Sequence, residues 1–282
     1  MSSNLNPYAY LQNEIIPLKS AYLHVSDLAI QRGYGVFDFF KIQNSTPLFL
    51  QDYLTRFYSS ALMMGLEVPL SEREITEVIL ELIQRNEMPE SGMKMILTGG
   101  YSANGYDPAE PNLIITQHSL PMPTEQQVNN GIKIITAEYI RELARAKTIN
   151  YSMGIRLIQQ VKSKGADDVL YHQNGVVTEF PRSNFFIVKQ DNTVATPAQE
   201  VLMGITRKNV LELAAKRYNV EEAEVTLQDI ANAKEAFMTS TTKRVLSIVE
   251  IDGRPIGNGK VGEVSKTLLQ DLIEFEERQI EE

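Results

Sequence analysis

One lysine lies in a stretch of the chain that carries little other charge. Lys147 stands in the segment Ala146-Lys-Thr-Ile-Asn-Tyr151, directly before a predicted helix over residues 152–164. Most single lysines lie at the surface, with the aliphatic stem on apolar groups and the ammonium in water. A lysine held against apolar surface loses basicity, and its amine can form a Schiff base with a carbonyl compound. Lys147 is therefore a candidate nucleophile, with a surface cation as the ordinary alternative.

A carboxylate follows a short apolar strand. Glu179 comes after Val176-Val-Thr178 and is followed by Phe180, Pro181 and the polar segment 182–184. Proline stops a strand, so the chain breaks into a loop here and would expose the carboxylate to a cleft. A solvated or paired carboxylate is the ordinary alternative.

Three further features could bind an anion. Gly204-Ile-Thr-Arg207 runs into a helix with Thr206 as the expected N-cap, and free N–H groups lie beyond such a cap. Thr239-Ser-Thr-Thr242 places four hydroxyl residues at the end of a strand. Arg56 lies beside the apolar face of an amphipathic helix. Taken singly, these features also fit a plain capped helix, a polar turn and a surface salt bridge.

Composition limits the other chemistries. The chain has 282 residues, no cysteine and three histidines, so it offers no disulfide or thiol nucleophile, and metal binding is not indicated. Its 27 basic and 36 acidic residues give a net charge of −9, which disfavours nucleic acid and anionic membranes as partners. No apolar run reaches the ~18 residues of a membrane span, and no signal-peptide pattern is visible, so we expect a cytoplasmic location. A bound anion needs a local pocket.

The first part of the chain predicts a small lobe. Residues 35–42 and 47–50 form a hairpin pattern, and two amphipathic helices follow, the second opening with the capping box Ser71-Glu-Arg-Glu74. Alternation over residues 93–97 and 112–116 indicates further strands. We therefore expect an α+β domain over residues 1–118, with helices on an antiparallel sheet, and a Pro-containing linker over residues 119–131.

The second part alternates irregularly between strands and helices over residues 132–282. Asn174-Gly175 and Asp252-Gly253 are strong hairpin signals, and they imply antiparallel neighbours. No Gly-rich dinucleotide fingerprint or P-loop is present. We expect a barrel-like mixed sheet instead of a doubly wound one.

The order of these motifs resembles the class IV pyridoxal-phosphate aminotransferases. That family includes branched-chain aminotransferases, D-amino acid aminotransferases and 4-amino-4-deoxychorismate lyases. The likeness covers nearly the whole chain, from Asp27–Asp38 to Ile251–Gly257 and Gly262. It implies the two-lobed α/β fold type IV, of α+β type, with pyridoxal 5′-phosphate between a small N-terminal and a larger C-terminal domain. It also implies assembly at least as a homodimer.

The resemblance assigns the reacting end of the cofactor to three residues. Lys147 resembles the lysine that forms the Schiff base with the cofactor aldehyde and then shuttles the proton between Cα and C4′. Glu179 matches the carboxylate that faces the pyridine nitrogen, where it favours the protonated ring. Tyr151 resembles the tyrosine near the cofactor's phenolic oxygen.

The resemblance also assigns the phosphate and the substrate. A helix N-terminus with one guanidinium suits a dianionic phosphate, even in a chain of charge −9. The matching cofactor residues are Arg56, Ile205, Thr206, Ser240 and Thr241. The matching substrate residues are Arg32, Phe37, Phe39, Lys41, Arg182 and Thr242.

The substrate segment departs from the family in several places. Arg32, Phe39 and Lys41 replace a tyrosine, a glycine and an arginine of branched-chain enzymes. Gly99 stands where D-amino acid enzymes carry a carboxylate-binding arginine, which argues against a D-specific enzyme. Arg182 lies where small residues are usual, and together with Arg32 and Lys41 it could receive a second carboxylate.

The resulting hypothesis is a transaminase. It would move an amino group between an α-amino acid, either a branched-chain-like L-amino acid or glutamate, and a 2-oxo acid by a ping-pong route. One alternative is a 4-amino-4-deoxychorismate lyase that releases pyruvate and 4-aminobenzoate. The other is a catalytically silent cofactor-binding protein, since fold alone does not establish activity.

Overall fold

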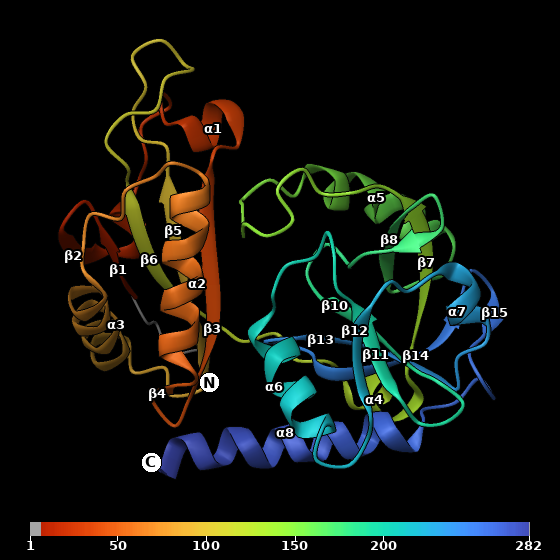
Figure 1. Cartoon of the computed structure of the whole chain (residues 1–282). Helices are drawn as coiled ribbons and strands as arrows, with labels where there is room; N and C mark the ends of the chain where they lie inside the picture. Colours follow the sequence, from red (N-terminus) through yellow and green to blue (C-terminus); the bar gives the residue numbers. More distant parts are fainter. Residues whose placement is uncertain (1–6, 282) are drawn as a thin grey trace. The chain divides into compact units, whose positions relative to one another are not determined.

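The computed structural model describes residues 7–281, which form two compact units (Figure 1). The first unit contains the chain up to Leu120 together with Ala146–Asn150, and the second contains Pro121–Arg145 and Tyr151–Glu281. Residues 146–150 are predicted from the sequence to lie in the C-terminal domain. The structure differs because this segment hydrogen-bonds to a strand of the first unit.

The first unit is an antiparallel sheet covered by helices. Its strands follow the order β2-β1-β6-β5-β3-β4. They are β1 (Tyr8–Leu11), β2 (Glu14–Pro17), β3 (Gly35–Gln43), β4 (Thr46–Pro47), β5 (Ser91–Thr98) and β6 (Leu113–His118). The helices are η1 (Leu18–Ser20), α1 (Leu28–Arg32), α2 (Leu50–Met63) and α3 (Glu72–Asn86), and the predicted capping box of α3 is confirmed.

Strand β3 has two different faces because side chains alternate along a strand. One face carries Asp38 and Phe40, both fully buried, and Phe40 lies 5.7 Å from the ring of Tyr53 on α2. The other face carries the predicted substrate residues Phe37 and Phe39. The helix side of the sheet therefore forms the core, and the opposite side presents the candidate residues.

The segment Ala146–Asn150 extends along the start of β3. The N–H of Phe37 donates to the carbonyl of Lys147 at 2.9 Å, and the N–H of Ile149 donates to the carbonyl of Gly35 at 3.1 Å. Val36 and Thr148 form an antiparallel bridge. These bonds satisfy the backbone at the start of β3 and fix the main chain around Lys147.

The second unit is built on a mixed sheet, as predicted. Its strands follow the order β12-β11-β10-β13-β14-β7-β8-β9, and β15 pairs with β14. They are β7 (Ile132–Glu138), β8 (Asp168–Gln173), β9 (Val176–Val177), β10 (Asn184–Val188), β11 (Val194–Pro197), β12 (Val220–Ala223), β13 (Glu235–Ser240), β14 (Arg244–Ile251) and β15 (Arg254–Pro255). The pairs β14–β7, β7–β8 and β11–β12 are parallel, and the other pairs are antiparallel.

The two predicted hairpin turns are present in the second unit. Asn174 and Gly175 have φ of 51° and 83°, and they join β8 to β9. Asp252 and Gly253 have φ of 50° and 76°, and they join β14 to β15. Two successive residues with positive φ form the turn that matches the twist of a two-residue hairpin.

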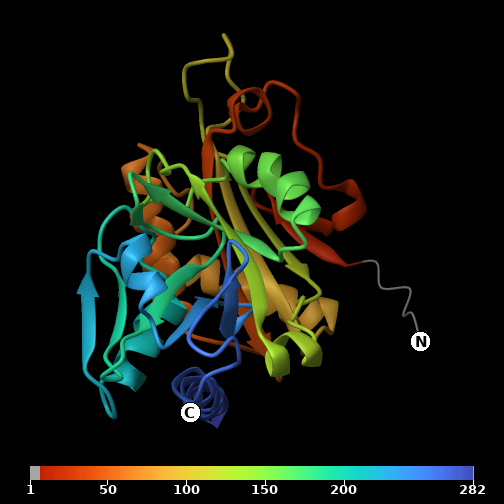
Figure 2. The ribbon, with the colours of Figure 1, turned by 90° about the vertical axis from the view of Figure 1, so that its right-hand side faces the viewer.

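The sheet of the second unit is buried on both faces. Phe185 and Ile187 of β10 belong to the core on the concave side, whereas Phe186 and Val188 pack under two helices. Those helices are α6 (Ile205–Ala214) and α8 (Glu263–Glu281), and Figure 2 shows α8 along its axis. Burial on both faces explains why β10 is apolar almost throughout.

Three further helices complete the second unit. They are α4 (Glu125–Asn130), α5 (Ser152–Ser163) and α7 (Leu227–Ala231). Helix α4 lies within the predicted linker 119–131, because Thr124 and Gln127 form a capping box that starts a helix there. The predicted start of α6 is also wrong, since Gly204 and not Thr206 is the N-cap.

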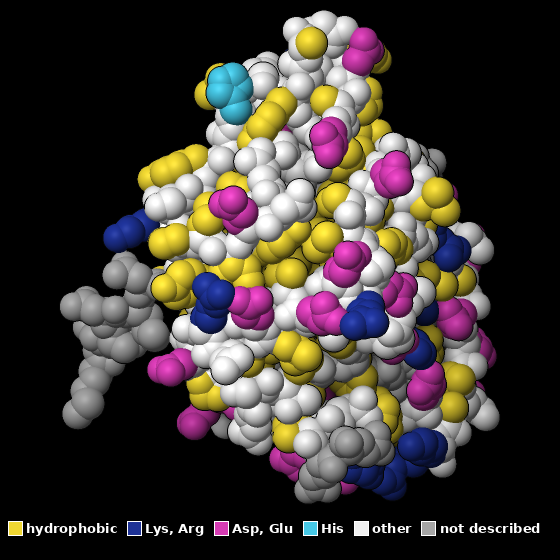
Figure 3. Space-filling model, turned by 90° about the vertical axis from the view of Figure 1, so that its left-hand side faces the viewer, with side chains coloured by type: hydrophobic (Ala, Val, Ile, Leu, Met, Phe, Trp, Pro, Cys, Tyr) yellow, Lys and Arg dark blue, Asp and Glu magenta, His cyan; other side chains and the backbone are white. Residues whose placement is uncertain are grey.

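The surface is mixed. Figure 3 shows hydrophobic side chains gathered toward the middle of one face, with separated acidic and basic side chains around them. Within residues 7–281, no helix combines the length and the hydrophobicity needed to cross a membrane.

Candidate active site in the two units

The predicted site residues are divided between the two units. The first unit holds Arg32, Phe37, Phe39, Lys41, Arg56 and Lys147. The second unit holds Tyr151, Glu179, Arg182, Ile205, Thr206, Ser240, Thr241 and Thr242.

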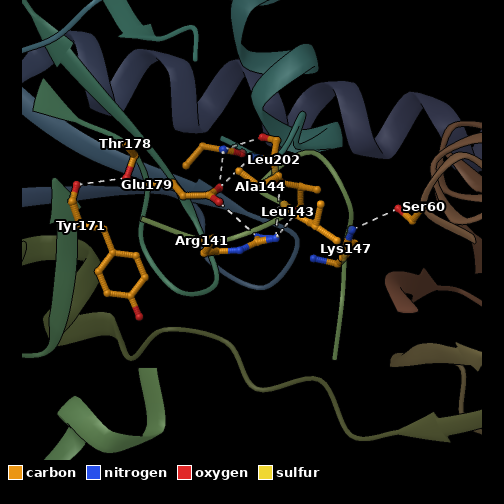
Figure 4. A network of polar contacts seen from close by, with 10 residues as sticks. Ser60, Arg141, Leu143, Ala144, Lys147, Tyr171, Thr178, Glu179 and Leu202 are labelled. Carbon is orange, nitrogen blue, oxygen red and sulfur yellow. Dashed lines mark hydrogen bonds and ion pairs between the residues drawn. The ribbon is translucent and has the colours of Figure 1, made fainter. Parts of the chain in front are cut away.

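Lys147 has a fixed main chain and a side chain that lies on an aromatic ring. Its N–H donates to Oγ of Ser60 at 3.1 Å, and Ser60 is fully buried on α2 (Figure 4). Its ammonium lies 4.8 Å from the ring centroid of Phe37. A cation above an aromatic face is attracted by the ring quadrupole, so Phe37 helps to direct the amine.

A second lysine shares the same ring. Lys94 on β5 places its ammonium 5.4 Å from the centroid of Phe37. The pKa of His118 lies below its ordinary value, first because the ring is partly buried and then because of the charge of Lys94. Phe37 therefore contacts two ammonium groups, and Lys94 is not among the residues predicted from sequence.

Phe39 and Lys41 continue this face of β3. Lys41 is 5% exposed, and its register partner on β5 is Gly92. A Cβ at Gly92 would come within 2.0 Å of the Phe39 ring, so only glycine leaves room for that ring across β5. The structure thus brings Phe37, Phe39 and Lys41 together on one face.

Arg32 lies on a different element. It is the last residue of α1, its side chain is exposed, and its Nη1 donates to the carbonyl of Gln31 at 3.1 Å. Helix α1 begins at the N-cap Asp27 and ends at Gly33, whose φ of 65° suits glycine. Arg32 is therefore not on the β3 face that carries the other predicted substrate residues of this unit.

Arg56 is held by a buried acid. Its Nε donates to Oδ2 of Asp38 at 2.8 Å, and its Nη2 donates to Oδ1 at 2.6 Å. The side chain of Arg56 is 11% exposed and that of Asp38 is fully buried. A bidentate pair fixes the guanidinium plane, so Asp38 determines how Arg56 can present itself to an anion.

Glu179 lies in a network of donors in the second unit. Its Oε1 faces Nη1 of Arg141 at 3.2 Å, and its Oε2 accepts the N–H of Leu202 at 3.0 Å (Figure 4). Asn184 donates to the same Oε2 at 3.4 Å and to the carbonyl of Leu202 at 2.8 Å. Only 3% of Glu179 is exposed, so these donors stabilise a carboxylate that burial alone would penalise.

The start of α6 fits a phosphate group. Gly204 is the N-cap and makes no side-chain capping bond, and the first intrahelical N–H that donates to its carbonyl is that of Lys208. The N–H groups of Ile205 and Thr206 therefore lie in the first turn, where a helix offers donors to an anion. Ile205 is buried and Thr206 is half-buried.

The hydroxyl run ends β13 and forms a turn. Ser240, Thr241 and Thr242 are all half-buried, and Oγ of Ser240 accepts the N–H of Lys243 at 3.2 Å. Together with the α6 terminus, this unit supplies neutral donors of the kind that hold phosphate. The residues present therefore fit a phosphorylated cofactor.

A cavity of about 270 Å³ lies beside this turn within the second unit. Arg182, Ser240 and Thr242 line it, as does Ser183, whose buried Oγ has no partner among the described residues. An ion pair between Lys243 and Asp168, at 2.8 Å, lies in the same wall. The cavity thus joins predicted cofactor and substrate residues of this unit.

Tyr151 directly precedes α5. It occupies the N-cap position without a side-chain capping bond, and its carbonyl accepts the N–H of Ile155 at 3.0 Å. The side chain is half-buried.

Several residues that support the predicted ones are not among the predictions from sequence. Asp38 and Lys94 carry a signal that could have been used, because each is a charged residue inside a strand with apolar neighbours. Ser60, Arg141 and Asn184 contact Lys147 or Glu179 only after the chain has folded, and their local sequence gives no comparable signal.

Comparison with known proteins agrees with this geometry. The family model described as amino-transferase class IV matches residues 35–251. A D-alanine aminotransferase of Bacillus licheniformis is 31% identical over 257 residues, covering 88% of this chain and 91% of the relative. A putative branched-chain-amino-acid aminotransferase of Methanocaldococcus jannaschii is 31% identical over 271 residues, covering 92% and 93%.

The fold also matches that of a solved aminotransferase structure. A structure of the branched-chain amino acid aminotransferase of T.th., with pyridoxamine 5′-phosphate, matches with a TM-score of 0.89 and 26% identity. The match covers 95% of this chain and 93% of that one. The predicted α+β architecture with a mixed second sheet is confirmed.

Proposed function

Because this chain belongs to the class IV aminotransferases, which are pyridoxal-phosphate enzymes, we propose that it moves an amino group from an L-α-amino acid to a 2-oxo acid with Lys147 as the catalytic residue. The observation that carries the proposal is the setting of Lys147, whose backbone is bonded at both its N–H and its carbonyl and whose amine lies on Phe37. Such a lysine is presented in one direction, as a nucleophile must be.

Each part of the chemistry has a residue. When bound, the cofactor supplies the aldehyde for amine exchange and the electron sink for the substrate carbanion. Lys147 would hold the cofactor and move the proton at the substrate Cα. Glu179 would present its carboxylate to the ring nitrogen, and Tyr151 its hydroxyl to the phenolic oxygen. Arg56, the first turn of α6 and the Ser240–Thr241 turn would hold the phosphate.

The surroundings of Gly99 support an L-amino acid as the proposed substrate. A Cβ at this position would lie 2.8 Å from the ring of Tyr34 and 3.0 Å from Leu28. No larger side chain fits there without moving both, so this position cannot supply the carboxylate-binding arginine expected of D-specific enzymes. This supports an L-amino acid substrate, although relatives from Bacillus licheniformis and Listeria monocytogenes are named D-alanine aminotransferases.

The substrate side chain would meet both apolar and cationic groups. Phe37 and Phe39 offer an aromatic wall, which suits a branched-chain side chain. Lys41 on the same face and Arg182 beside the cavity could receive a second carboxylate, as in glutamate or 2-oxoglutarate. Thr242 lines that cavity. Arg32 is a weaker candidate because it lies on α1.

The proposal is tested by trapping the covalent bond between the cofactor and Lys147. Purified protein with pyridoxal phosphate should show a visible absorption band that borohydride removes, and peptide mass analysis should then find the cofactor on Lys147. Lys147→Ala should lack both signals, whereas Lys162→Ala, an exposed lysine on α5, should keep them. A reduced adduct on another lysine, or full transaminase activity in Lys147→Ala, would refute the proposal.

Half-reactions decide between substrates. Stopped-flow spectra with single L- and D-amino acids should show conversion of the cofactor band with L-leucine-like or L-glutamate donors. The lyase alternative is not favoured, since the relatives carry aminotransferase names. Release of pyruvate and 4-aminobenzoate from 4-amino-4-deoxychorismate, without a 2-oxo acid acceptor, would reverse that preference.

We also propose a homodimer. Tyr22, Ile30 and Tyr106 of the first unit are 76%, 56% and 77% exposed, so they are hydrophobic side chains of this unit that a partner subunit could cover. Light scattering should give twice the chain mass, and Ile30→Asp should shift the species toward monomer. The cytoplasmic location stays a prediction.

A further inference from the structure

Arg141 connects the carboxylate of Glu179 to a fixed part of the backbone. It lies in the loop after β7, and its Nη1 is 3.2 Å from Oε1 of Glu179. Its Nη2 donates to the carbonyls of Leu143 and Ala144, both at 3.4 Å (Figure 4). The side chains of Arg141 and Glu179 are only 13% and 4% exposed. The guanidinium is therefore held by its own loop, and the carboxylate is held by the guanidinium.

The charge of Glu179 matters for the function proposed above. A carboxylate beside the ring nitrogen favours the protonated ring only while it stays ionised. Burial opposes ionisation, and the N–H of Leu202 and the amide of Asn184 are neutral donors. A guanidinium stays charged at every working pH, so it can balance the buried carboxylate throughout that range.

We propose that Arg141 is a positioning residue that keeps Glu179 ionised and fixes its orientation toward the cofactor ring. The proposal rests on the proposed function for its consequence, but the ion pair can be tested without the cofactor. Arg141 would not touch the reacting atoms, and its effect would pass through Glu179.

Three residues interact with the pair from β8, β10 and the loop before α6, namely Tyr171, Asn184 and Leu202. From β8, Tyr171 interacts with both members, and burial raises the pKa of its phenol above the ordinary value. Tyr139, Asp168 and Glu179 add to that rise, and Arg141 opposes it. The phenol therefore stays protonated at working pH and cannot replace the charge of Arg141. From β10 and the loop before α6, Asn184 and Leu202 contribute no charge.

The first test uses the apoprotein. In Arg141→Met the buried carboxylate loses this cation, so the pKa of Glu179 should lie roughly 2–4 pH units above its ordinary value of ~4.3. Urea unfolding at several pH values should show this as an extra loss of stability as the pH rises from ~4.3, the ordinary pKa, to the raised pKa between ~6 and ~8, and the wild type should lack this loss. The double variant Arg141→Met/Glu179→Gln should lack this pH-dependent loss of stability. Arg141→Lys keeps the positive charge and should show little of the loss.

The second test uses the holoenzyme. The visible band of bound cofactor should gain the same additional pH step in Arg141→Met, and the cofactor dissociation constant should rise on the order of tenfold, as expected for one lost charge-assisted hydrogen bond. Arg145→Met is the matched control, because Arg145 is exposed on the same loop. It should behave as the wild type in both tests.

The outcomes separate the two proposals. An unchanged pH profile of Arg141→Met in both tests would overturn the role of Arg141. Equal destabilisation by Arg141→Met with and without Glu179 would do the same, since it would show a purely structural role. A wild-type protein that forms no adduct at Lys147 would instead refute the proposed function, and the apoprotein test of Arg141 would still stand.

Discussion

Arg56 and Asp38 form a bidentate ion pair between α2 and β3, with Nε–Oδ2 and Nη2–Oδ1 distances of 2.8 and 2.6 Å. The acid is on the helix-facing side of β3, opposite the face that carries Phe37 and Phe39. A residue proposed to bind phosphate is thus oriented by a carboxylate that is itself fully buried. The pair holds α2 against the strand and sets the direction of the guanidinium.

Breaking this pair should affect both stability and cofactor binding. Asp38→Ala leaves a nearly buried guanidinium without this acid, and the free energy of unfolding should fall by about 3–5 kcal/mol. Arg56→Lys keeps the charge but loses the bidentate geometry, so it should weaken cofactor binding more than it weakens the fold. Urea unfolding and cofactor titration measure the two effects separately.

An exposed pair provides the control. Arg73 and Glu77 on α3 are 2.9 Å apart with side chains 88% and 61% exposed. Glu77→Gln should change the free energy of unfolding by no more than about 0.5 kcal/mol. An Asp38→Ala protein as stable as Glu77→Gln would show that the buried pair contributes little.

Gly92 should be required by the ring of Phe39. In Gly92→Ala the new Cβ would lie 2.0 Å from that ring, so the ring must move off the face of β5. We expect a loss of about 1–3 kcal/mol in unfolding free energy, as in other overpacked sites, and altered rates with branched-chain donors. Phe39→Leu should recover part of the stability in the Gly92→Ala background. Additive losses in the double variant would contradict this packing relationship.

Much of the fold could be predicted because local signals and tertiary packing agree. The capping box at Ser71 and the turns at Asn174-Gly175 and Asp252-Gly253 are encoded by adjacent residues, and all three are present. The helix α4 was hidden by the prolines that precede it, and β1 and β2 are too short to show a clear alternation. Residues 146–150 join the first unit through backbone bonds to β3, which no local pattern reveals.

The candidate site was predictable to the extent that a residue's role is carried by its own motif. Phe37 and Lys41 share a face because they are an even number of positions apart on one strand. Partners distant in sequence were not predictable. Arg141 is 38 residues from Glu179, and Ser60 is 87 residues from Lys147. Only the folded chain brings these groups within hydrogen-bond distance.

Stability should depend on the protonation of His118. Partial burial of its ring, followed by the charge of Lys94, lowers its pKa in the folded protein below the ordinary ~6.5. The unfolded chain therefore binds the proton more readily, so this contribution to stability is complete above that pH and is lost as the pH falls. The effect should be small, since the side chain is partly exposed.

Lys94→Met tests the electrostatic part of this shift. Removing the cation should raise the pKa of His118 toward its ordinary value and flatten the decline of stability below pH ~6.5. NMR titration of the ring protons measures the pKa directly, and His24 and His172 serve as internal controls because the chain has three histidines. An unchanged His118 titration in Lys94→Met would leave burial as the whole cause.

Gly204 should be needed for the carboxylate network as well as for the start of α6. Its φ of −66° is open to any residue, so a substitution there tests space and not backbone strain. In Gly204→Ala the new Cβ would lie 2.1 Å from Oδ1 of Asn184, which must then give up its bonds to Glu179 or to the carbonyl of Leu202.

We therefore expect Gly204→Ala to weaken cofactor binding about tenfold, the cost of roughly one hydrogen bond to a charged group. Asn184→Ala removes the clash together with the bond to Glu179, so adding Gly204→Ala to it should cause little further loss. Cofactor titration of the two single variants and the double variant measures this coupling. If the two losses simply add, the glycine acts through the first turn of α6 and its phosphate donors, and not through Asn184.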